Sequence, residues 1–78
     1  MKYIVFQDES SILFSESQSH LCMAGWKPVK SAGFCLIETY RNDFDDIRAR
    51  VSCYGESTTL GVKSNPEDSK ILEGLWRQ

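Results

Sequence analysis

Residues 51–68 read VSCYGESTTLGVKSNPED, and the order of residue types in this stretch indicates how the chain folds. The strand-forming run 51–54 ends at a glycine, which accepts the positive φ that a tight turn needs. A short run at 58–63 follows and predicts a strand that pairs back onto the first. The polar group after it is typical of a helix start. The stretch therefore predicts strand, turn, strand and helix in succession.

The predicted C-terminal helix has two alternative starts. Ser64 and Glu67 have the spacing of a capping box, whereas Asn65 as the cap would make Pro66 the first helical residue. In both cases, acidic residues at 67 and 68 lie near the positive end of the helix dipole. An apolar stripe at helical spacing then predicts packing against a sheet, and it consists of Ile71, Leu72, Leu75 and Trp76.

Upstream of this stretch, residues 47–54 alternate between apolar and polar side chains, which predicts a strand with one buried and one solvated face. Residues 39–46 are polar and predict a loop at the end of the sheet. The acidic part of this loop, 42–46, lacks the spacing of a calcium-binding loop, so we expect it to be solvated and expect no metal. Residues 32–37 are apolar on both alternating faces and predict a central strand.

The N-terminal part predicts a β-hairpin, with strands at 3–6 and 12–14. A short helix over 18–24 follows, capped by Ser15 or Ser17 and stopped by Gly25 in a left-handed conformation. Its expected apolar face consists of Leu21, Met23 and Ala24.

Together these elements predict a single α+β domain over residues 1–78. The order strand, strand, helix, strand, strand, strand, helix is typical of a two-layer sandwich, with an antiparallel sheet and both helices packed on one face. The other face would be open to solvent and would carry Arg48, Arg50 and Tyr54.

Composition and charge exclude several classes of protein. The 78 residues are 41% hydrophobic with a net charge of -2, which favours an ordered globule and gives no long-range attraction to nucleic acid or anionic lipid. Polar residues interrupt the apolar start at Gln7, before a signal peptide would be complete. No stretch approaches a membrane span. We therefore expect a cytoplasmic protein.

The cysteines and the one histidine are the candidates for catalysis. Cys22, Cys35 and Cys53 have neither zinc-site nor disulfide-framework spacing, so buried reduced thiols are expected. On a helix, His20 and Cys22 would point in different directions, with His20 partly exposed beside a core cysteine. A small thiol-dependent enzyme would need His20 near Cys35 or Cys53 in the fold.

Other catalytic and cofactor patterns are weak. The run Gly55-Glu56-Ser57 lacks the second glycine of a serine nucleophile elbow, so we expect a hairpin turn with Glu56 and Ser57 facing water. Neither a phosphate-binding loop nor a dinucleotide fingerprint occurs, and we expect no cofactor.

Several short motifs resemble those of short bacterial and phage-borne proteins that are predicted from genomes and have no assigned role. The motifs are Ser31-Ala32-Gly33-Phe34, Cys53-Tyr54-Gly55-Glu56-Ser57, Leu60-Gly61, Lys63-Ser64 and Pro66-Glu67-Asp68. The resemblance covers residues 31–73 and implies a compact stand-alone domain, without an activity to transfer.

The sequence predicts a small binding or regulatory protein that acts by protein–protein contact, with a homodimer as one form of this contact. The expected binding surface consists of Arg48, Arg50, Tyr54, Glu56 and Ser57. Two alternatives are the thiol-dependent enzyme and a weak single-stranded nucleic-acid binder that uses the arginines and Tyr54.

Overall fold

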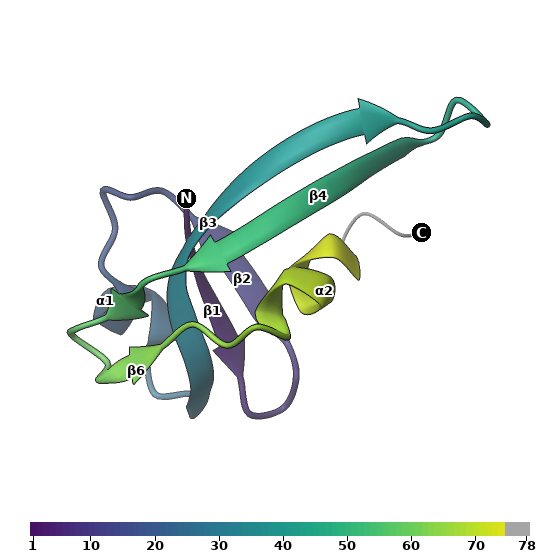
Figure 1. The fold of residues 1–78 in the computed structure, drawn as a ribbon. Helices are drawn as coiled ribbons and strands as arrows, with labels where there is room; N and C mark the ends of the chain where they lie inside the picture. The colour runs from purple at the N-terminus through teal and green to yellow at the C-terminus, as the bar shows by residue number, and fades with distance from the viewer. Residues whose placement is uncertain (75–78) are drawn as a thin grey trace.

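The structure, a computed structural model, describes residues 1–74, and Figure 1 shows the arrangement of their helices and strands. The elements are β1 (Lys2–Phe6), β2 (Ser11–Phe14), α1 (His20–Ala24), β3 (Val29–Arg41), β4 (Ile47–Tyr54), β5 (Glu56–Ser57), β6 (Val62–Lys63) and α2 (Asp68–Glu73). The main sheet is antiparallel with the strand order β2-β1-β3-β4. The predicted α+β class is confirmed.

The predicted strand at 58–63 is wrong in its extent and its pairing. Residues 58–61 form a turn, and the two short strands on either side of it, β5 and β6, pair with each other. Gly55, at φ 75°, lies between β4 and β5 and turns the chain away from the main sheet. The two-stranded sheet is therefore separate from the main one.

Strand β3 is central, as predicted, but it is longer than predicted, and the expected loop at 39–46 shrinks to 42–46. The pairing of β3 with β4 continues outward through this segment, with Tyr40 opposite Arg48 and Arg41 opposite Ile47. The loop is closed by Asn42, whose Oδ1 accepts hydrogen bonds from the backbone N–H groups of Phe44 and Asp46.

The two helices pack on opposite faces of the sheet, so the prediction of both on one face is wrong. One buried cluster joins Leu72 of α2 to Tyr3, Val5, Cys35 and Val51. The other joins Ala24 of α1 to Ile4, Phe6, Phe14 and Ala32. Successive residues of a strand point to opposite faces, and β1 is buried on both, which means that each face needs a cover. Figure 1 shows α1 and α2 on either side of β1.

Helix α1 is shorter than predicted and buries different residues. Ser19, and neither Ser15 nor Ser17, is the cap, because its Oγ accepts a hydrogen bond from the Cys22 N–H at 3.1 Å. Gly25 ends the helix at φ 59°, as predicted. A helix of five residues presents only one narrow stripe to the sheet, so His20 and Ala24 are its buried residues. Leu21 and Met23, which were expected on the buried face, are exposed.

Neither of the two alternative starts is met, because α2 begins at Asp68, with Glu67 before it and no side-chain cap hydrogen bond. Asn65 and Asp68 instead hold the turn that precedes the helix. The Asn65 Oδ1 accepts a hydrogen bond from the Glu67 N–H, and an Asp68 carboxyl oxygen accepts one from the Asn65 N–H. Of the predicted stripe, Leu72 is fully buried and Ile71 packs beside it, whereas Leu75 and Trp76 lie outside the described residues. No helix within residues 1–74 has the length and apolar character to cross a membrane.

Candidate functional site

The outer part of the β3–β4 hairpin projects from the rest of the molecule. Strand β1 pairs with β3 only as far as Phe34, so residues 36–52 form a ribbon of two strands, which we call the arm. Figure 1 shows the arm extending away from α1, with α2 beside its β4 strand. The molecule is correspondingly elongated, with dimensions of 41 × 24 × 19 Å. A two-stranded ribbon buries little surface of its own, so the side chains on the face that α2 leaves uncovered stay available for contact.

One face of the arm carries aromatic, aliphatic and arginine side chains, and we call it the outer face. Directly opposed residues of paired strands share a face, and α2 packs against the other one through Val51 and Leu72. The exposed fraction is 62% for Leu36 and 46% for Tyr40. The outer face consists of Leu36, Glu38, Tyr40, Arg48, Arg50 and Ser52.

Charges on the outer face are arranged across the two strands. Arg50 lies directly opposite Glu38, and its guanidinium group is 5.6 Å from the centre of the Tyr40 ring. Arg48 forms an ion pair with Asp46 at 3.6 Å. Among the described residues, Arg50 has no ion pair within 4 Å, so its charge is available to a partner. The structure therefore brings the predicted residues Arg48 and Arg50 together on one exposed face.

The predicted binding residue Tyr54 lies at the base of the arm, on the same face of β4 as the arginines. Its ring stacks on Phe34, with the ring centres 5.9 Å apart, and it is 46% exposed. Glu56 is exposed but belongs to β5, beyond the arm. Ser57 is buried, and its Oγ accepts a hydrogen bond from the Leu60 N–H, so the prediction that it faces water is wrong. The β5–β6 turn folds over it.

The structure separates His20 from the two cysteines of the sheet. His20 is buried against Phe14 and Phe34 on the α1 side, and its Nε2 is 2.8 Å from the Gly33 carbonyl oxygen. Cys35 and Cys53 point to the α2 side. The expected environments of His20 and Cys22 are reversed, because His20 faces the sheet and Cys22 is exposed. The geometry provides no thiol–imidazole pair among these residues.

Burial raises the pKa of the Cys35 thiol, and the nearby Cys53 adds to the effect. The pKa of Cys53 is also raised, mainly by burial. A catalytic thiol needs the opposite shift, towards a lower pKa. Cys35 and Cys53 therefore have the environment of structural thiols in the reduced protein.

A buried carboxyl group on the α2 side was missed by the sequence analysis. Asp68 is 0% exposed, and it accepts hydrogen bonds from the Tyr3 hydroxyl at 2.5 Å and the Ser31 hydroxyl at 2.8 Å. The Asn65 N–H donates to it as well, at 2.9 Å. The sequence placed Asp68 in a helix start, which is usually solvated. No sequence signal marks the two hydroxyl donors, because they come from distant strands.

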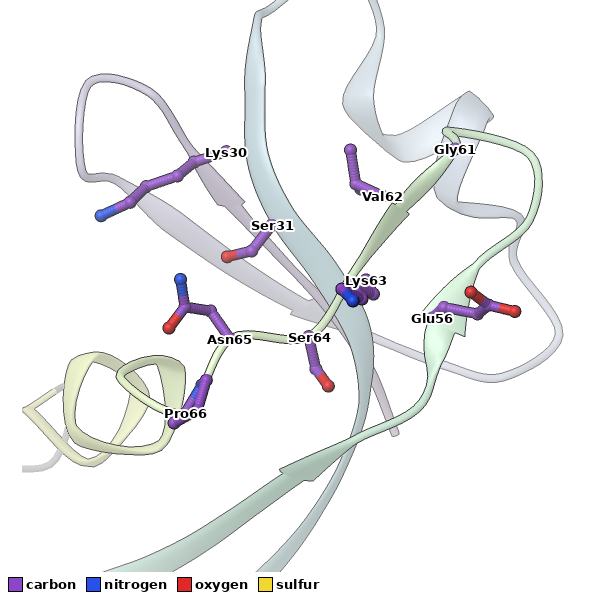
Figure 2. A pocket seen from close by; sticks show the side chains of 9 residues that line it. All are labelled: Lys30, Ser31, Glu56, Gly61, Val62, Lys63, Ser64, Asn65 and Pro66. Carbon is purple, nitrogen blue, oxygen red and sulfur yellow. The ribbon is translucent and has the colours of Figure 1, made fainter.

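A hollow of about 500 Å³ lies beside the start of α2, and Figure 2 shows the side chains around it. Lys30 and Glu56 extend on opposite sides of it, with Lys63 between them. The Ser31 hydroxyl donates to Asp68 and is therefore already engaged. Because the charged groups of both signs diverge, the hollow does not form a site for one charged ligand. Its lining consists of Lys30, Ser31, Glu56, Gly61, Val62, Lys63, Ser64, Asn65 and Pro66.

Comparison of the chain with protein-family models, with curated proteins and with solved structures found no match.

Proposed function

We propose that this protein is a small binding or regulatory protein that acts by protein–protein contact through the outer face of the arm. The observation that carries the proposal is the exposure of Leu36 and Tyr40 beside Arg50 on a ribbon face without a covering helix in the described part of the chain. Tyrosine and arginine are enriched among the residues that dominate binding energy in protein interfaces. A projecting arm also offers such a face without steric conflict from the rest of the molecule.

A second copy of the chain is the partner that the charges favour. Glu38 and Arg50 lie opposite each other on adjacent strands. In a twofold-symmetric contact, each residue of one patch meets the same patch on the other copy. An axis between the two strands would bring Arg50 of each copy to Glu38 of the other, with the Leu36 side chains nearby. The proposed unit is therefore a homodimer formed by two outer faces.

Light scattering of the pure protein at tens of micromolar tests the homodimer. We expect a dimer for the natural chain and a monomer for Leu36→Ser. The matched control is Ile47→Ser, because Ile47 is 56% exposed, close to the 62% of Leu36, but lies on the other face of the arm. A monomeric natural chain, or equal effects of the two substitutions, would overturn the homodimer.

If the protein is a monomer, the same variants test a different protein partner. A partner captured from the host should be lost with Arg48→Glu/Arg50→Glu and with Leu36→Ser, and kept with Ile47→Ser. Retention by all the variants would reject the outer face as the binding surface. The binding function and the identity of its partner are thus tested separately.

The proposed location is the cytoplasm. The odd number of cysteines and their wide spacing support it, since small secreted domains usually hold their fold with paired disulfides.

A second candidate function is weak binding of single-stranded nucleic acid. The exposed rings of Tyr40 and Tyr54 on the same side as Arg48 and Arg50 favour it, because bases stack on aromatic rings while arginines contact phosphates. The net charge of -2 opposes it. Fluorescence anisotropy with a labelled oligonucleotide at low salt tests this candidate, and binding that is unchanged in Arg50→Glu would exclude the outer face as the site.

A further inference from the structure

Cys35 and Cys53 are direct neighbours across β3 and β4. The backbone hydrogen bonds around them show whether they form a hydrogen-bonded or a non-hydrogen-bonded pair of the antiparallel ladder. The Cys53 N–H donates to the Ser69 Oγ and the Val51 N–H donates to a Glu73 carboxyl oxygen, so these two groups of β4 point away from β3. The backbone of Cys35 turns the other way, because its N–H donates to the Met1 carbonyl and its carbonyl accepts from the Met1 amino group. Cys35 and Cys53 are therefore a non-hydrogen-bonded pair.

This kind of pair has the spacing that a disulfide needs. In antiparallel sheets, the Cα atoms of a non-hydrogen-bonded pair are about 4.5 Å apart, and their side chains are closer than in a hydrogen-bonded pair. Disulfides span Cα distances of about 4.4–6.8 Å. Both side chains point to the α2 side, where Cys53 packs against the cluster that contains Cys35. Neither strand would have to shift its register to form the bond.

We propose that Cys35 and Cys53 form a reversible intramolecular disulfide, with a low-molecular-weight disulfide such as oxidised glutathione as the oxidant. The Cys53 thiolate attacks the added disulfide and releases one thiol. The Cys35 thiolate then attacks the Cys53 sulfur and releases the second thiol. The two protein thiols lose two electrons and two protons, which leave in the two product thiols. Cys35, although buried, needs no contact with solvent, because it attacks a sulfur already beside it.

The disulfide would fasten the arm at its base. Residue 35 is the position at which β3 leaves the pairing with β1 and continues only with β4. The raised pKa of both thiols leaves little thiolate at neutral pH, so oxidation should be slow there and faster as the pH rises. This site is separate from the outer face, because its side chains lie on the opposite face of the ribbon. Its test does not depend on the proposed binding function.

The test uses a Cys22→Ser background, which removes the exposed thiol. The protein is equilibrated with mixtures of oxidised and reduced glutathione, and the disulfide is located by peptide mass mapping. We expect a Cys35–Cys53 bond with an effective thiol concentration about 30-fold or more above that of the same chain in denaturant. A ratio near one, no oxidation, or a glutathione adduct that stays on Cys53 would overturn the proposal.

Two controls make the result specific. Cys35→Ala should stop the reaction at the glutathione adduct of Cys53, and an unmodified Cys53 in that variant would contradict the order of attack. The second control moves the pair by one position, to Leu36→Cys/Ser52→Cys in a Cys35→Ala/Cys53→Ala background. Leu36 and Ser52 are the adjacent opposed pair, so they lie in the hydrogen-bonded register. We expect a lower effective concentration there, and equal values would overturn the role of the pair's register.

Discussion

The Tyr3 hydroxyl donates a hydrogen bond of 2.5 Å to the carboxyl group of Asp68, which is 65 residues away in the sequence. Both residues are 0% exposed. The contact joins β1, at the start of the chain, to the first residue of α2, near its end. Helix α2 has six residues and is too short to be stable alone, so its position depends on tertiary contacts such as this hydrogen bond.

Removing the Tyr3 hydroxyl should destabilise the fold. In Tyr3→Phe, the buried carboxyl group of Asp68 loses one of its donors while the ring still fills the core. We expect a loss of about 1–3 kcal/mol in the free energy of unfolding, measured by urea titration. Tyr54→Phe is the matched control, because its ring is 46% exposed, and its effect should be close to zero. Equal stabilities of the two variants would contradict the structural role of the contact.

Stability should fall at alkaline pH because of Tyr3. Its burial, followed by the hydrogen bond to Asp68, raises its pKa well above the ordinary value. In the unfolded chain, Tyr3 loses its proton near its usual pKa of about 10, whereas the folded chain keeps it. The folded state then binds more protons, so the free energy of unfolding falls by up to about 1.4 kcal/mol for each further pH unit.

Urea titrations between about pH 9 and pH 11 measure this effect as the difference between the natural chain and Tyr3→Phe. The raised pKa of Cys35 acts in the same direction but is common to both proteins and cancels in the difference. The pKa of Cys53 also depends on a hydrogen bond with Tyr3, so both proteins carry Cys53→Ala in this comparison. A difference that stays constant over this range would rule out a contribution from Tyr3.

A side chain at residue 33 should destabilise the fold. A Cβ atom there would lie 2.7 Å from the Tyr54 carbonyl oxygen and 3.3 Å from the Ser64 Cβ, because the chain leaving β4 crosses directly over β3. We expect Gly33→Ala to cost about 1–3 kcal/mol in urea titrations. The control is Gly74→Ala, where the backbone is helical and the space is open, with an expected gain of about 0.4–1 kcal/mol. A Gly33→Ala protein of natural stability would contradict the close crossing.

Asn65 should contribute more to α2 than Ser64 does. Its side chain accepts a hydrogen bond from the Glu67 N–H at 3.1 Å, and Asn65→Ala removes that bond. We expect a loss of about 1 kcal/mol, comparable to the loss of a helix cap, against little change for Ser64→Ala. Urea titration of the two variants measures this difference. A larger loss for Ser64→Ala would contradict the role of the Asn65 side chain in the turn before α2.

Strong local patterns predicted most of the elements. The alternation over residues 47–54 predicted β4, and the apolar runs on either side of the first turn predicted the β1–β2 hairpin. Gly25 marked the end of α1 because its positive φ excludes most other residues. These signals are local, since each depends on the backbone preference or periodicity of a few neighbouring residues.

Weaker local signals failed where distant contacts decided the outcome. The polar run from Thr39 looked like a loop, yet it pairs with β4, because a solvated ribbon needs no apolar side chains. His20 looked partly exposed, but the sheet buries it. The sequence predicted part of the proposed binding surface. Arg48 and Arg50 do share an exposed face of the arm, whereas Ser57, which was expected on the same surface, is buried outside the arm.

The sequence by itself determined the α+β class, the central place of β3 and the β1–β2 hairpin, because side-chain periodicity and turn residues act over a few neighbours. Only the tertiary structure decided that the helices cover opposite faces, that the hydroxyls of Tyr3 and Ser31 meet Asp68, and that Cys35 faces Cys53. These relationships join residues far apart in the chain. They are set by strand register and by the need to bury both faces of β1, which no local pattern encodes.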